Sequence, residues 1–536
     1  MMRFFRRTKV LLLTLAGLAL LGCGDGEWGE PEPAPDGWQD WGADSTQDQG
    51  ELPEPEKELR IQPPEAAKDF VFVASTELDS VARIDARSME IRSIAVGDRP
   101  TVVRCRKSTN TAVVLNLGSS DLSIIHSTPG GGDVLARLPV ASGLNQVRLS
   151  PDGRYALVYF DPEAEGADFS TSPLIELQLV QLARVEQGSE TIVDLVISYL
   201  PEEILFEAEG DDVFVLTQDF LHRFSPDTVI DAPSSYDPRA RIKLIEDPLS
   251  IGKQLEVVIS SGGHFALVRE PDQARLGIVD LLTQEHRILE LDGIPTELDL
   301  LPDGLGALLV IPSTQQLVLL SLPEAFDEPE SVRVIQAPES IPVAQALVSP
   351  SGDKAVLFST AASSSTIGEL DLSSAELTAY RLGSGKVISG GVRGPQGKWI
   401  YIAHDGEPSN PDPVRQSPGF SLLSFDSAEN GGRPFDKLFL SPIAPSPVMF
   451  TEDEQHFFAL INQPTSERFE VIGIELPSLR ATTFRVGSPP VQVGGLPDAR
   501  RVYVAQEHPV GRLAFIEVDD LSIQTVTGFE LNSKIR

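Results

Sequence analysis

The sequence predicts an all-β protein, a β-propeller of about ten four-stranded units that follows a signal peptide and a disordered linker. A short apolar run recurs ten times after residue 69, at intervals of about 42 to 58 residues, which is the period of propeller blades with some loop insertions. Beyond the first 23 residues, no stretch shows a sustained helical period. The runs are 70–73, 112–115, 155–158, 213–216, 265–268, 307–310, 355–358, 399–402, 457–460 and 502–505.

The first 22 residues have the pattern of an export signal. Four basic residues precede an apolar stretch at 10–21, which is too short to span a bilayer because about 20 residues are needed. The stretch ends in Leu20-Leu21-Gly22-Cys23. This ending resembles the lipobox of bacterial lipoproteins. The alternative is an ordinary signal peptide with a chance cysteine.

The resemblance implies that Cys23 is acylated and that the chain is cut just before it. Each buried CH₂ contributes about 0.8 kcal/mol and stable anchoring needs more than one acyl chain, so we expect a membrane-bound protein. Asp after the cysteine commonly retains lipoproteins in the inner membrane, and here the residue is Gly24. We therefore expect an outer-membrane lipoprotein that faces the periplasm or the cell surface.

A linker is predicted at 23–68 and the propeller domain at 69–536. The linker is rich in Pro, Glu, Asp, Gln and Gly, and such a segment cannot bury enough apolar surface to offset its ordering entropy. Three of the four tryptophans, Trp28, Trp38 and Trp41, lie in it. They could meet the membrane interface or a partner.

The negative net charge argues against nucleic acids as partners. The chain has a net charge of −36, and removal of the leader would take away four basic residues and no acidic one. Phosphate backbones would repel such a chain, so nucleic-acid binding is disfavoured.

Tight polar turns precede the apolar runs. The best examples are Ser150-Pro151-Asp152-Gly153 and Leu301-Pro302-Asp303-Gly304, in which proline presets φ and glycine accepts a positive φ. We expect these turns to be equivalent and to join an outer strand of one unit to the first strand of the next. Continuous apolar strands imply burial on both faces, which blades packed around a ring provide. One large ring is expected because no linker interrupts the repeats; two rings in tandem are the alternative.

Two units resemble the YVTN-type β-propeller repeat, whose pattern is Val-Gly, Pro, Ser-Pro-Asp-Gly and Tyr-Val-x-Asn. One is 96–116, with Val-Gly-Asp-Arg-Pro followed by Val-Val-Leu-Asn, and the other is 486–506. The likeness is partial or weak elsewhere. It implies a fold more than a function, since the superfamily includes lactonase-like enzymes, haem-containing reductase domains, surface-layer proteins and scaffolds.

The last unit shows three strands, near Val502, Leu513 and Gln524. An unpaired edge would leave donors and acceptors exposed, and rings often close with a strand from the other terminus. We therefore expect residues 59–62 to supply the fourth strand of the last unit.

No catalytic or cofactor motif stands out. The seven histidines are scattered without paired ligand spacing, and Cys-x-x-Cys-His, Gly-x-Ser-x-Gly and phosphate-binding glycine loops are missing. We expect no metal, no cofactor and no catalytic residue. The second cysteine, Cys105, is flanked by basic residues that would lower a thiol pKa, but a half-buried structural cysteine is the favoured interpretation.

Two long polar insertions, 161–172 and 404–419, follow the first strand of their units and are expected on one face of the ring. Binding residues tend to lie on such loops, but a surface insertion that is merely tolerated would have the same length and composition. The second loop carries the candidate partner-binding residues His404, Asp405, Glu407, Asp412 and Arg415. The sequence thus favours a non-enzymatic lipoprotein whose propeller binds a protein partner. The alternatives are a lactonase-like periplasmic hydrolase and an accessory lipoprotein of outer-membrane protein assembly.

Overall fold

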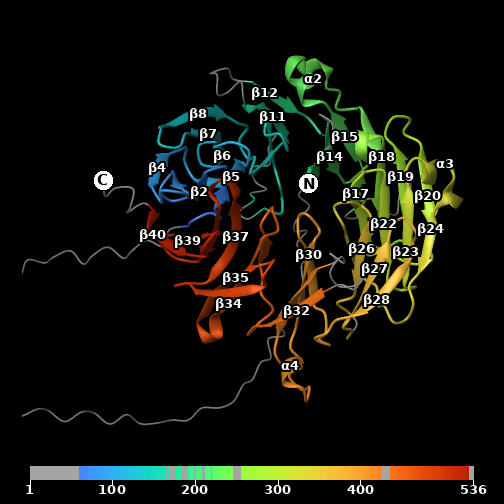
Figure 1. Ribbon diagram of the computed structural model, residues 1–536. Helices are drawn as coiled ribbons and strands as arrows, with labels where there is room; N and C mark the ends of the chain where they lie inside the picture. Colours follow the sequence, from blue (N-terminus) through green and yellow to red (C-terminus); the bar gives the residue numbers. More distant parts are fainter. Residues whose placement is uncertain are drawn as a thin grey trace, which may run out of the picture. The chain divides into compact units, whose positions relative to one another are not determined.

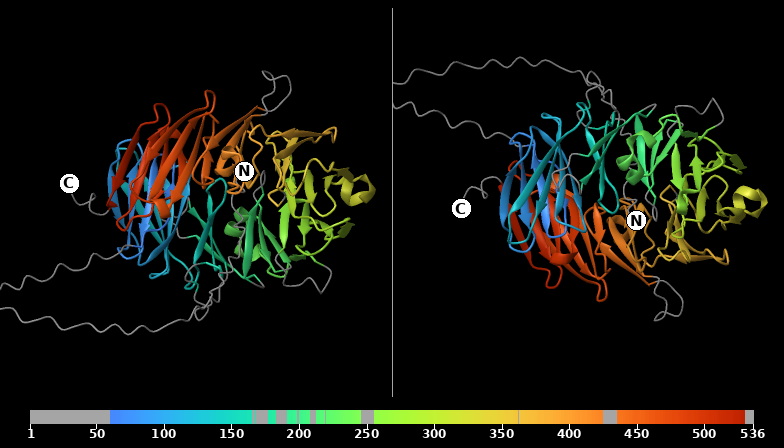
Figure 2. Two further views of the ribbon diagram at one scale, coloured as in Figure 1. Left: turned by 90° about the horizontal axis from the view of Figure 1, so that it is seen from below. Right: turned by 90° about the horizontal axis from the view of Figure 1, so that it is seen from above.

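The computed structural model describes residues 60–164, 167, 177–182, 191–197, 200–207, 212–218, 220–245, 255–361, 363–424 and 435–529. This part forms ten antiparallel sheets of four consecutive strands, numbered here as blades 1 to 10 in chain order. The blades follow each other around one ring, and blade 10 lies beside blade 1 (Figures 1 and 2). The prediction of a single ten-unit propeller is confirmed, and the alternative of two rings in tandem is wrong.

Each blade runs in chain order from its first strand to its fourth. The first strands are β1 (Glu65–Ala66), β5 (Pro100–Arg106), β9 (Gln146–Leu149), β13 (Pro201–Phe206), β17 (Glu256–Ile259), β21 (Glu297–Leu300), β25 (Gln345–Val348), β29 (Gly390–Arg393), β33 (Val448–Phe450) and β37 (Pro490–Leu496). The second strands are β2 (Phe70–Ser75), β6 (Thr111–Asn116), β10 (Tyr155–Tyr159), β14 (Val213–Thr217), β18 (Phe265–Arg269), β22 (Gly306–Ile311), β26 (Lys354–Phe358), β30 (Trp399–His404), β34 (His456–Gln463) and β38 (Arg501–Gln506).

The outer half of each blade follows. The third strands are β3 (Ser80–Asp85), β7 (Asp121–Ser127), β11 (Leu177–Gln181), β15 (Phe220–Phe224), β19 (Arg275–Asp280), β23 (Gln316–Ser321), β27 (Thr366–Asp371), β31 (Gly419–Ser424), β35 (Arg468–Glu475) and β39 (Arg512–Glu517). The fourth strands are β4 (Ile91–Ala95), β8 (Asp133–Pro139), β12 (Ile192–Leu195), β16 (Arg241–Lys243), β20 (His286–Glu290), β24 (Arg333–Gln336), β28 (Leu377–Arg381), β32 (Phe435–Leu440), β36 (Arg480–Arg485) and β40 (Ile523–Thr527).

Short helices lie in some connections. They are α2 (Pro226–Asp231), α3 (Glu324–Asp327) and α4 (Pro413–Gln416), with 3₁₀ turns η2 (Pro233–Ser235), η4 (Ser261–Gly263), η5 (Pro329–Ser331), η6 (Pro464–Ser466) and η7 (Pro497–Ala499). Among the described residues, no helix has the length and apolarity that a membrane crossing requires.

All ten apolar runs are second strands, so the prediction that they begin their units is wrong by one strand. The second strand has a pairing partner on each side and a neighbouring blade on each face, and β2 and β6 are buried at every position. The first strands of neighbouring blades contact each other around the axis and are less buried. In β29, every residue is only half-buried. The first strand therefore lacks a continuous apolar run and escapes a search for one.

The polar turns are equivalent, as predicted, but they lie inside a blade rather than between two blades. Gly153 and Gly304 both have a φ of 69°. The first lies between β9 and β10 and the second between β21 and β22, which are first and second strands in each case. The prediction that such turns link consecutive units is wrong because it placed the apolar runs one strand too early.

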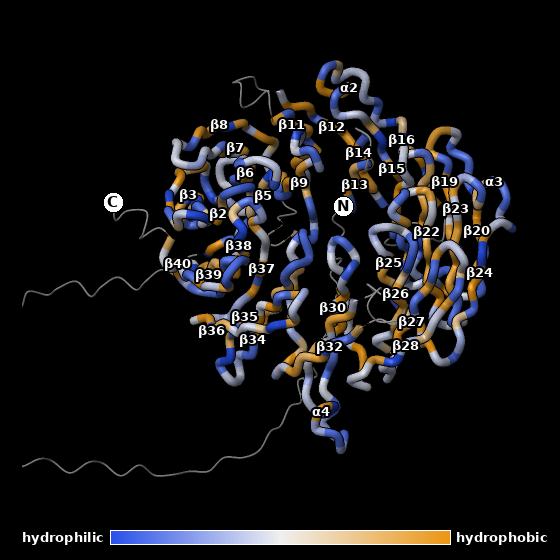
Figure 3. Tube along the Cα trace, viewed as in Figure 1, coloured by the Kyte–Doolittle hydropathy of each residue, from blue (hydrophilic) through white to orange (hydrophobic). Residues whose placement is uncertain are grey.

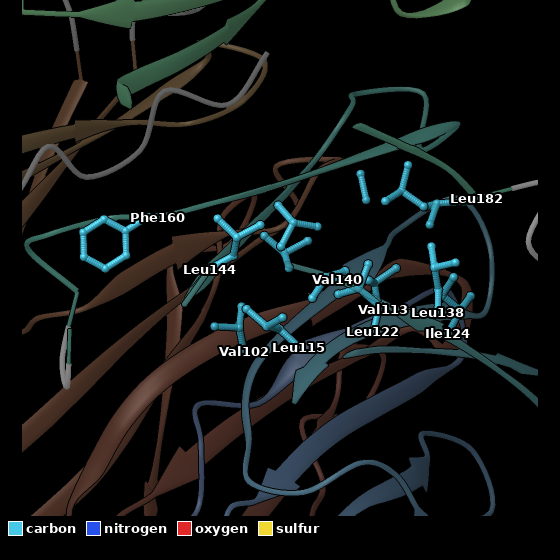
Figure 4. Close-up of a cluster of buried hydrophobic side chains, with 14 residues drawn as sticks. Val102, Val113, Leu115, Leu122, Ile124, Leu138, Val140, Leu144, Phe160 and Leu182 are labelled. Atoms are coloured by element: carbon cyan, nitrogen blue, oxygen red, sulfur yellow. The ribbon is translucent and has the colours of Figure 1, made fainter. Parts of the chain in front are cut away.

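The core consists of layers between neighbouring blades. In the layer between blades 2 and 3, fourteen side chains from both sheets interdigitate, and Figure 4 shows Val113, Leu115 and Phe160 among them. Burying one such aliphatic side chain contributes about 1.5–3 kcal/mol. Figure 3 shows that the hydrophobic stretches follow the strands, while the connections are mostly hydrophilic.

The ring closes without strand exchange, so the prediction that residues 59–62 complete the last blade is wrong. Blade 10 takes all four strands from its own segment, because β40 pairs with β39. Ile61 instead forms a bridge with Ser75 of blade 1, and residue 59 lies outside the described part. Blades 1 and 10 are held together by a shared apolar layer that includes Val71, Tyr503 and Phe515.

The ring also begins before residue 69. Strand β1 (Glu65–Ala66) pairs with β2, and the described residues from Arg60 onward belong to one compact unit. The last residues of the predicted linker are therefore part of the ring.

The turns between first and second strands contact one another around the ring. A Cβ on Gly304 would lie 2.7 Å from Cβ of Ser261, and one on Gly397 would lie 2.3 Å from Cδ of Pro350, each in the turn of the preceding blade. In blade 9 the same position holds Glu454, with a φ of 48° and 2% exposure. Its carboxylate accepts four backbone N–H groups, at Gln396 (2.5 Å), Gly397 (2.8 Å), Lys398 (3.0 Å) and Trp399 (3.2 Å) of blade 8.

Candidate functional site

Residues 405–418 connect the second and third strands of blade 8 and contain α4. The connection stands out from the ring (Figure 1). Its ends are fixed because His404 of β30 pairs with Gly419 of β31. The predicted insertion at 404–419 is therefore a projection from a rigid blade, although it follows the second strand and not the first.

Hydrogen bonds across the loop give it a defined shape. The Oε1 atom of Glu407 accepts from the guanidinium of Arg415 at 2.9 Å, and the Glu407 N–H donates to the carbonyl of Arg415 at 2.9 Å. Asn410 donates to the other carboxylate oxygen of Glu407 at 2.8 Å. These donors lower the pKa of Glu407. Asp412 caps α4 by accepting the N–H of Val414 at 2.9 Å.

A buried lysine holds the loop from beneath. Lys386, in the connection that leads from blade 7 into blade 8, is fully buried. Its Nζ donates to the carbonyls of Val414, at 2.7 Å, and Ser417. Burial lowers the pKa of Lys386, while Glu407 and Asp412 oppose this change. The buried ammonium group thus joins the loop to the connection that leads into blade 8.

His404 does not belong to the surface of the loop, so the prediction that it contacts a partner is wrong. The ring is fully buried, with Nδ1 3.0 Å from the carbonyl oxygen of Val387 and Nε2 2.8 Å from Oγ of Ser421. Burial lowers its pKa to about 4, so the imidazole is neutral at pH 7. His404 therefore fixes the base of the loop.

The other candidate residues divide between surface and support. Asp405 and Asp412 are exposed, whereas Glu407 and Arg415 are half-buried and paired with each other. Val414 is 40% exposed on α4. Pro408, Pro411 and Pro413 are exposed as well. The outward surface thus combines acidic carboxylates with rigid apolar groups.

An exposed leucine extends this surface onto the blade. Leu440 of β32 is 53% exposed and pairs with Gly419 at the end of the loop. A Cβ on Gly419 would lie 2.4 Å from the carbonyl oxygen of Phe439, so the strands approach closely there. The outer edge of blade 8 therefore presents an apolar side chain next to the base of the loop.

The second predicted insertion, 161–172, lies largely outside the described residues. It also connects a second strand to a third strand, β10 to β11. Because equivalent connections leave the sheets at the same end, the two insertions start on one face of the ring, as predicted.

Cys105 faces the junction of blades 1 and 2. Burial raises the pKa of its thiol well above the usual value, with a further contribution from Glu65. The half-buried Cys105 thiol lies 3.6 Å from the carbonyl oxygen of Glu65. These surroundings keep the thiol protonated, which agrees with a structural cysteine.

Glu297, on the first strand of blade 6, is the most perturbed carboxyl group among the described residues. Burial, together with the neighbouring carboxylates of Asp299 and Glu256, raises its pKa to about 8. Its Oε2 atom accepts the N–H of Ala346 in blade 7 at 2.5 Å. Perturbed carboxyls often mark active sites. Here the group joins two blades, and no described set of three or more His, Cys, Asp or Glu residues lies close enough to bind a metal.

His222 of β15 is a second unusual titratable group. The ring is 1% exposed, and neither nitrogen has a hydrogen-bond partner within the described part of the chain. Burial, together with the nearby positive charge of Arg241, lowers its pKa to about 4.

Sequence reasoning missed two residues that shape this region, Lys386 and Glu454. Lys386 lies between the glycines of 383–385 and the apolar pair Val387-Ile388, an unusual place for a solvated lysine. Glu454 occupies the glycine position of the aligned turns, so an alignment of the ten units would have drawn attention to it.

The chain matches no protein-family model and no curated protein sequence. Among solved structures, it resembles a eukaryotic initiation factor, with 11% identity over 84% of this chain and 94% of that chain and a TM-score of 0.48. It also resembles the dihydro-heme d1 dehydrogenase NirN, with 13% identity, 78% and 73% coverage and a TM-score of 0.41. For Hsv2p of Kluyveromyces lactis, the identity is 10%, the coverage 65% and 98%, and the TM-score 0.37. We transfer no activity from these proteins.

Proposed function

We propose that this protein is an exported, membrane-anchored lipoprotein whose propeller binds a protein partner through the loop at 405–418. One observation carries the proposal: the loop is pre-shaped. The buried Lys386 and the Glu407–Arg415 pair hold it, so little conformational entropy is lost when it docks.

The exposed groups define the kind of partner. Asp405 and Asp412 favour a surface that contributes positive charge, and the chain as a whole has a net charge of −36. Val414 and the exposed prolines favour apolar or aromatic side chains on that surface. Contact should weaken as salt concentration rises, because the exposed charges are screened.

The binding proposal is tested by replacing 405–418 with a short Gly-Ser bridge. The replacement removes the acceptors of Lys386, so it is combined with Lys386→Met to avoid an unpaired buried cation. We expect both proteins to fold, as judged by circular dichroism, because β30 and β31 still pair. Proteins that co-purify with wild type from membranes should be lost from the variant. Retention of every partner would show that the loop is only a tolerated insertion.

A point substitution separates contact from folding. Val414→Ser removes an exposed apolar group and leaves the backbone bonds of α4 in place. Its control is Val334→Ser, at a valine that is 58% exposed on β24 of another blade. The first should weaken partner capture and the second should not. Equal capture by both variants would count against α4 as the contact.

The anchor proposal rests on Cys23 and the lipobox pattern. Cys23→Ala should leave the chain uncleaved or soluble, because the thiol is the site of acylation. Incorporation of radiolabelled palmitate by the variant would contradict the assignment. The Gly24 residue after the cysteine favours the outer membrane, which fractionation of the two membranes would test.

A further inference from the structure

The seam between blades 10 and 1 is the only junction in the ring whose blades are not consecutive in the chain. Residues 60–68, by which the chain enters the ring, lie across this seam. We call this segment the clasp.

The clasp belongs to blade 1 by backbone pairing. In β1, Glu65 pairs with Phe72 and Ala66 with Val71. Closer to the entry, the N–H of Gln62 donates to the carbonyl of Ala74 at 2.9 Å. The clasp therefore forms the inner edge of this blade.

The same segment contacts blade 10. The carbonyl of Pro64, a buried residue, accepts from Nε2 of Gln492 at 3.0 Å and from the hydroxyl of Tyr503 at 3.4 Å. Ile61 lines a small pocket together with Val510 and Phe529. Each of these partners belongs to the last blade or the segment after it.

The exit of the clasp is held on two further sides. The ammonium group of Lys68 lies 3.4 Å from Asp498 in blade 10, and the N–H of Lys68 donates to the carbonyl of Thr109 in blade 2 at 3.0 Å. Glu65 lies 3.6 Å from the guanidinium of Arg104, also in blade 2. One nine-residue segment thus touches blades 10, 1 and 2.

The same tyrosine-to-proline hydrogen bond occurs at the junction of blades 8 and 9, which are joined by a continuous stretch of chain. In blade 8, the hydroxyl of Tyr401 donates to the carbonyl of Pro445 at 2.7 Å. Pro445 lies in the connection from blade 8 to blade 9, and Tyr401 and Tyr503 are each the third residue of a second strand. Pro64 therefore occupies the position that Pro445 has at the other junction. Unlike Pro445, it is not joined through the chain to the blade whose tyrosine it contacts, which is blade 10.

We infer that residues 60–68 act as a releasable clasp: while seated they hold blade 10 against blade 1, and their withdrawal opens the ring at this seam. Because the clasp directly continues the linker, the state of that linker is coupled to closure of the ring. This inference does not depend on lipid attachment or on the partner loop.

The test measures how fast a buried thiol in the seam reacts. Ala82 is 3% exposed in the apolar layer of the seam, so Ala82→Cys reports its opening through maleimide labelling followed by peptide mapping. Ala307→Cys is the reference, since Ala307 is fully buried between blades 5 and 6. Both reporters are placed in the full chain.

Release is produced in two ways. Gln492→Met with Tyr503→Phe removes both donors to Pro64 and keeps the side-chain volumes, and deletion of 24–67 removes the clasp except for Lys68. We expect either change to speed labelling at residue 82 by about tenfold or more and to leave residue 307 unchanged. Tyr401→Phe and deletion of 24–57 are the matched controls and should alter neither rate. Unchanged labelling at residue 82, or an equal increase at residue 307, would overturn the inference.

Discussion

Glu454 allows a quantitative test of how neighbouring blades are joined. Its buried carboxylate accepts four backbone N–H groups from the turn of blade 8, at 2.5 to 3.2 Å. A hydrogen bond to a charged group contributes about 1.5–3 kcal/mol. Two of the donor residues, Gln396 and Lys398, are exposed, so water can replace the carboxylate there. The bonds to Gly397 and Trp399 are then lost without compensation. At about 1.5 kcal/mol for each of these two bonds, Glu454→Ala should lower the free energy of unfolding by about 3 kcal/mol.

The backbone conformation supplies a second comparison. Glu454 has a φ of 48°, a region that favours glycine, so Glu454→Gly loses the carboxylate and gains backbone relief of about 1 kcal/mol. We expect a loss of about 2 kcal/mol for this variant. Glu452→Ala is the control, because Glu452 is exposed in the same turn, and it should change stability by less than about 0.5 kcal/mol.

Urea denaturation gives the free energies, and hydrogen exchange at 396–399 locates the effect. Faster exchange at these four amides should accompany the loss of stability in both Glu454 variants. If Glu454→Ala is as stable as Glu452→Ala and exchange at 396–399 is unchanged, the carboxylate does not hold blade 9 to blade 8.

Three further predictions concern titratable side chains that are removed from solvent. Lys386→Met should cost about 1–3 kcal/mol and speed hydrogen exchange across 405–418, because the carbonyls of Val414 and Ser417 lose their donor, whereas Lys437→Met on the exposed strand β32 should change neither. Glu297 has a pKa of about 8 in the folded protein, against 4.5 in the unfolded chain. Stability should therefore fall as the pH rises from 4.5 to about 8. Glu297→Gln should remove that loss and gain on the order of 2 kcal/mol at pH 8, and equal pH profiles from urea titrations would contradict the assignment. His222 has a pKa lowered from 6.5 to about 4, so stability should fall as pH drops through that range. His222→Leu should flatten this part of the profile and be neutral or stabilising at pH 7, since no hydrogen bond is lost.

The number of blades could be predicted from the sequence because the second strands are buried on both faces. That burial requires a continuous apolar run, as in 112–115 or 307–310, and ten such runs mark ten blades. The position of each run within its blade could not be predicted in the same way. The first strand borders the axis, where mixed residues such as Glu297 and Asp299 are tolerated, so it gives no apolar signal.

The candidate loop was found by its length and composition, but the role of its residues could not be read from the sequence. His404 and Arg415 are both polar residues in a polar segment, yet the first is fully buried and the second pairs with Glu407. Lys386, which holds the loop in place, lies outside it in the sequence. It reaches the loop only because the connection into blade 8 folds beneath α4. Ring closure was misjudged for a similar reason: three strands of the last blade were visible, and the half-buried first strand β37 was not.

The assembly of every blade from four consecutive strands has a consequence for how such a protein can evolve. A duplicated or deleted stretch of DNA that starts and ends between two blades adds or removes a complete sheet and leaves no unpaired strand behind. This architecture therefore permits lineages to differ in ring size by whole blades, because every interface that such a change re-forms lies between two complete sheets.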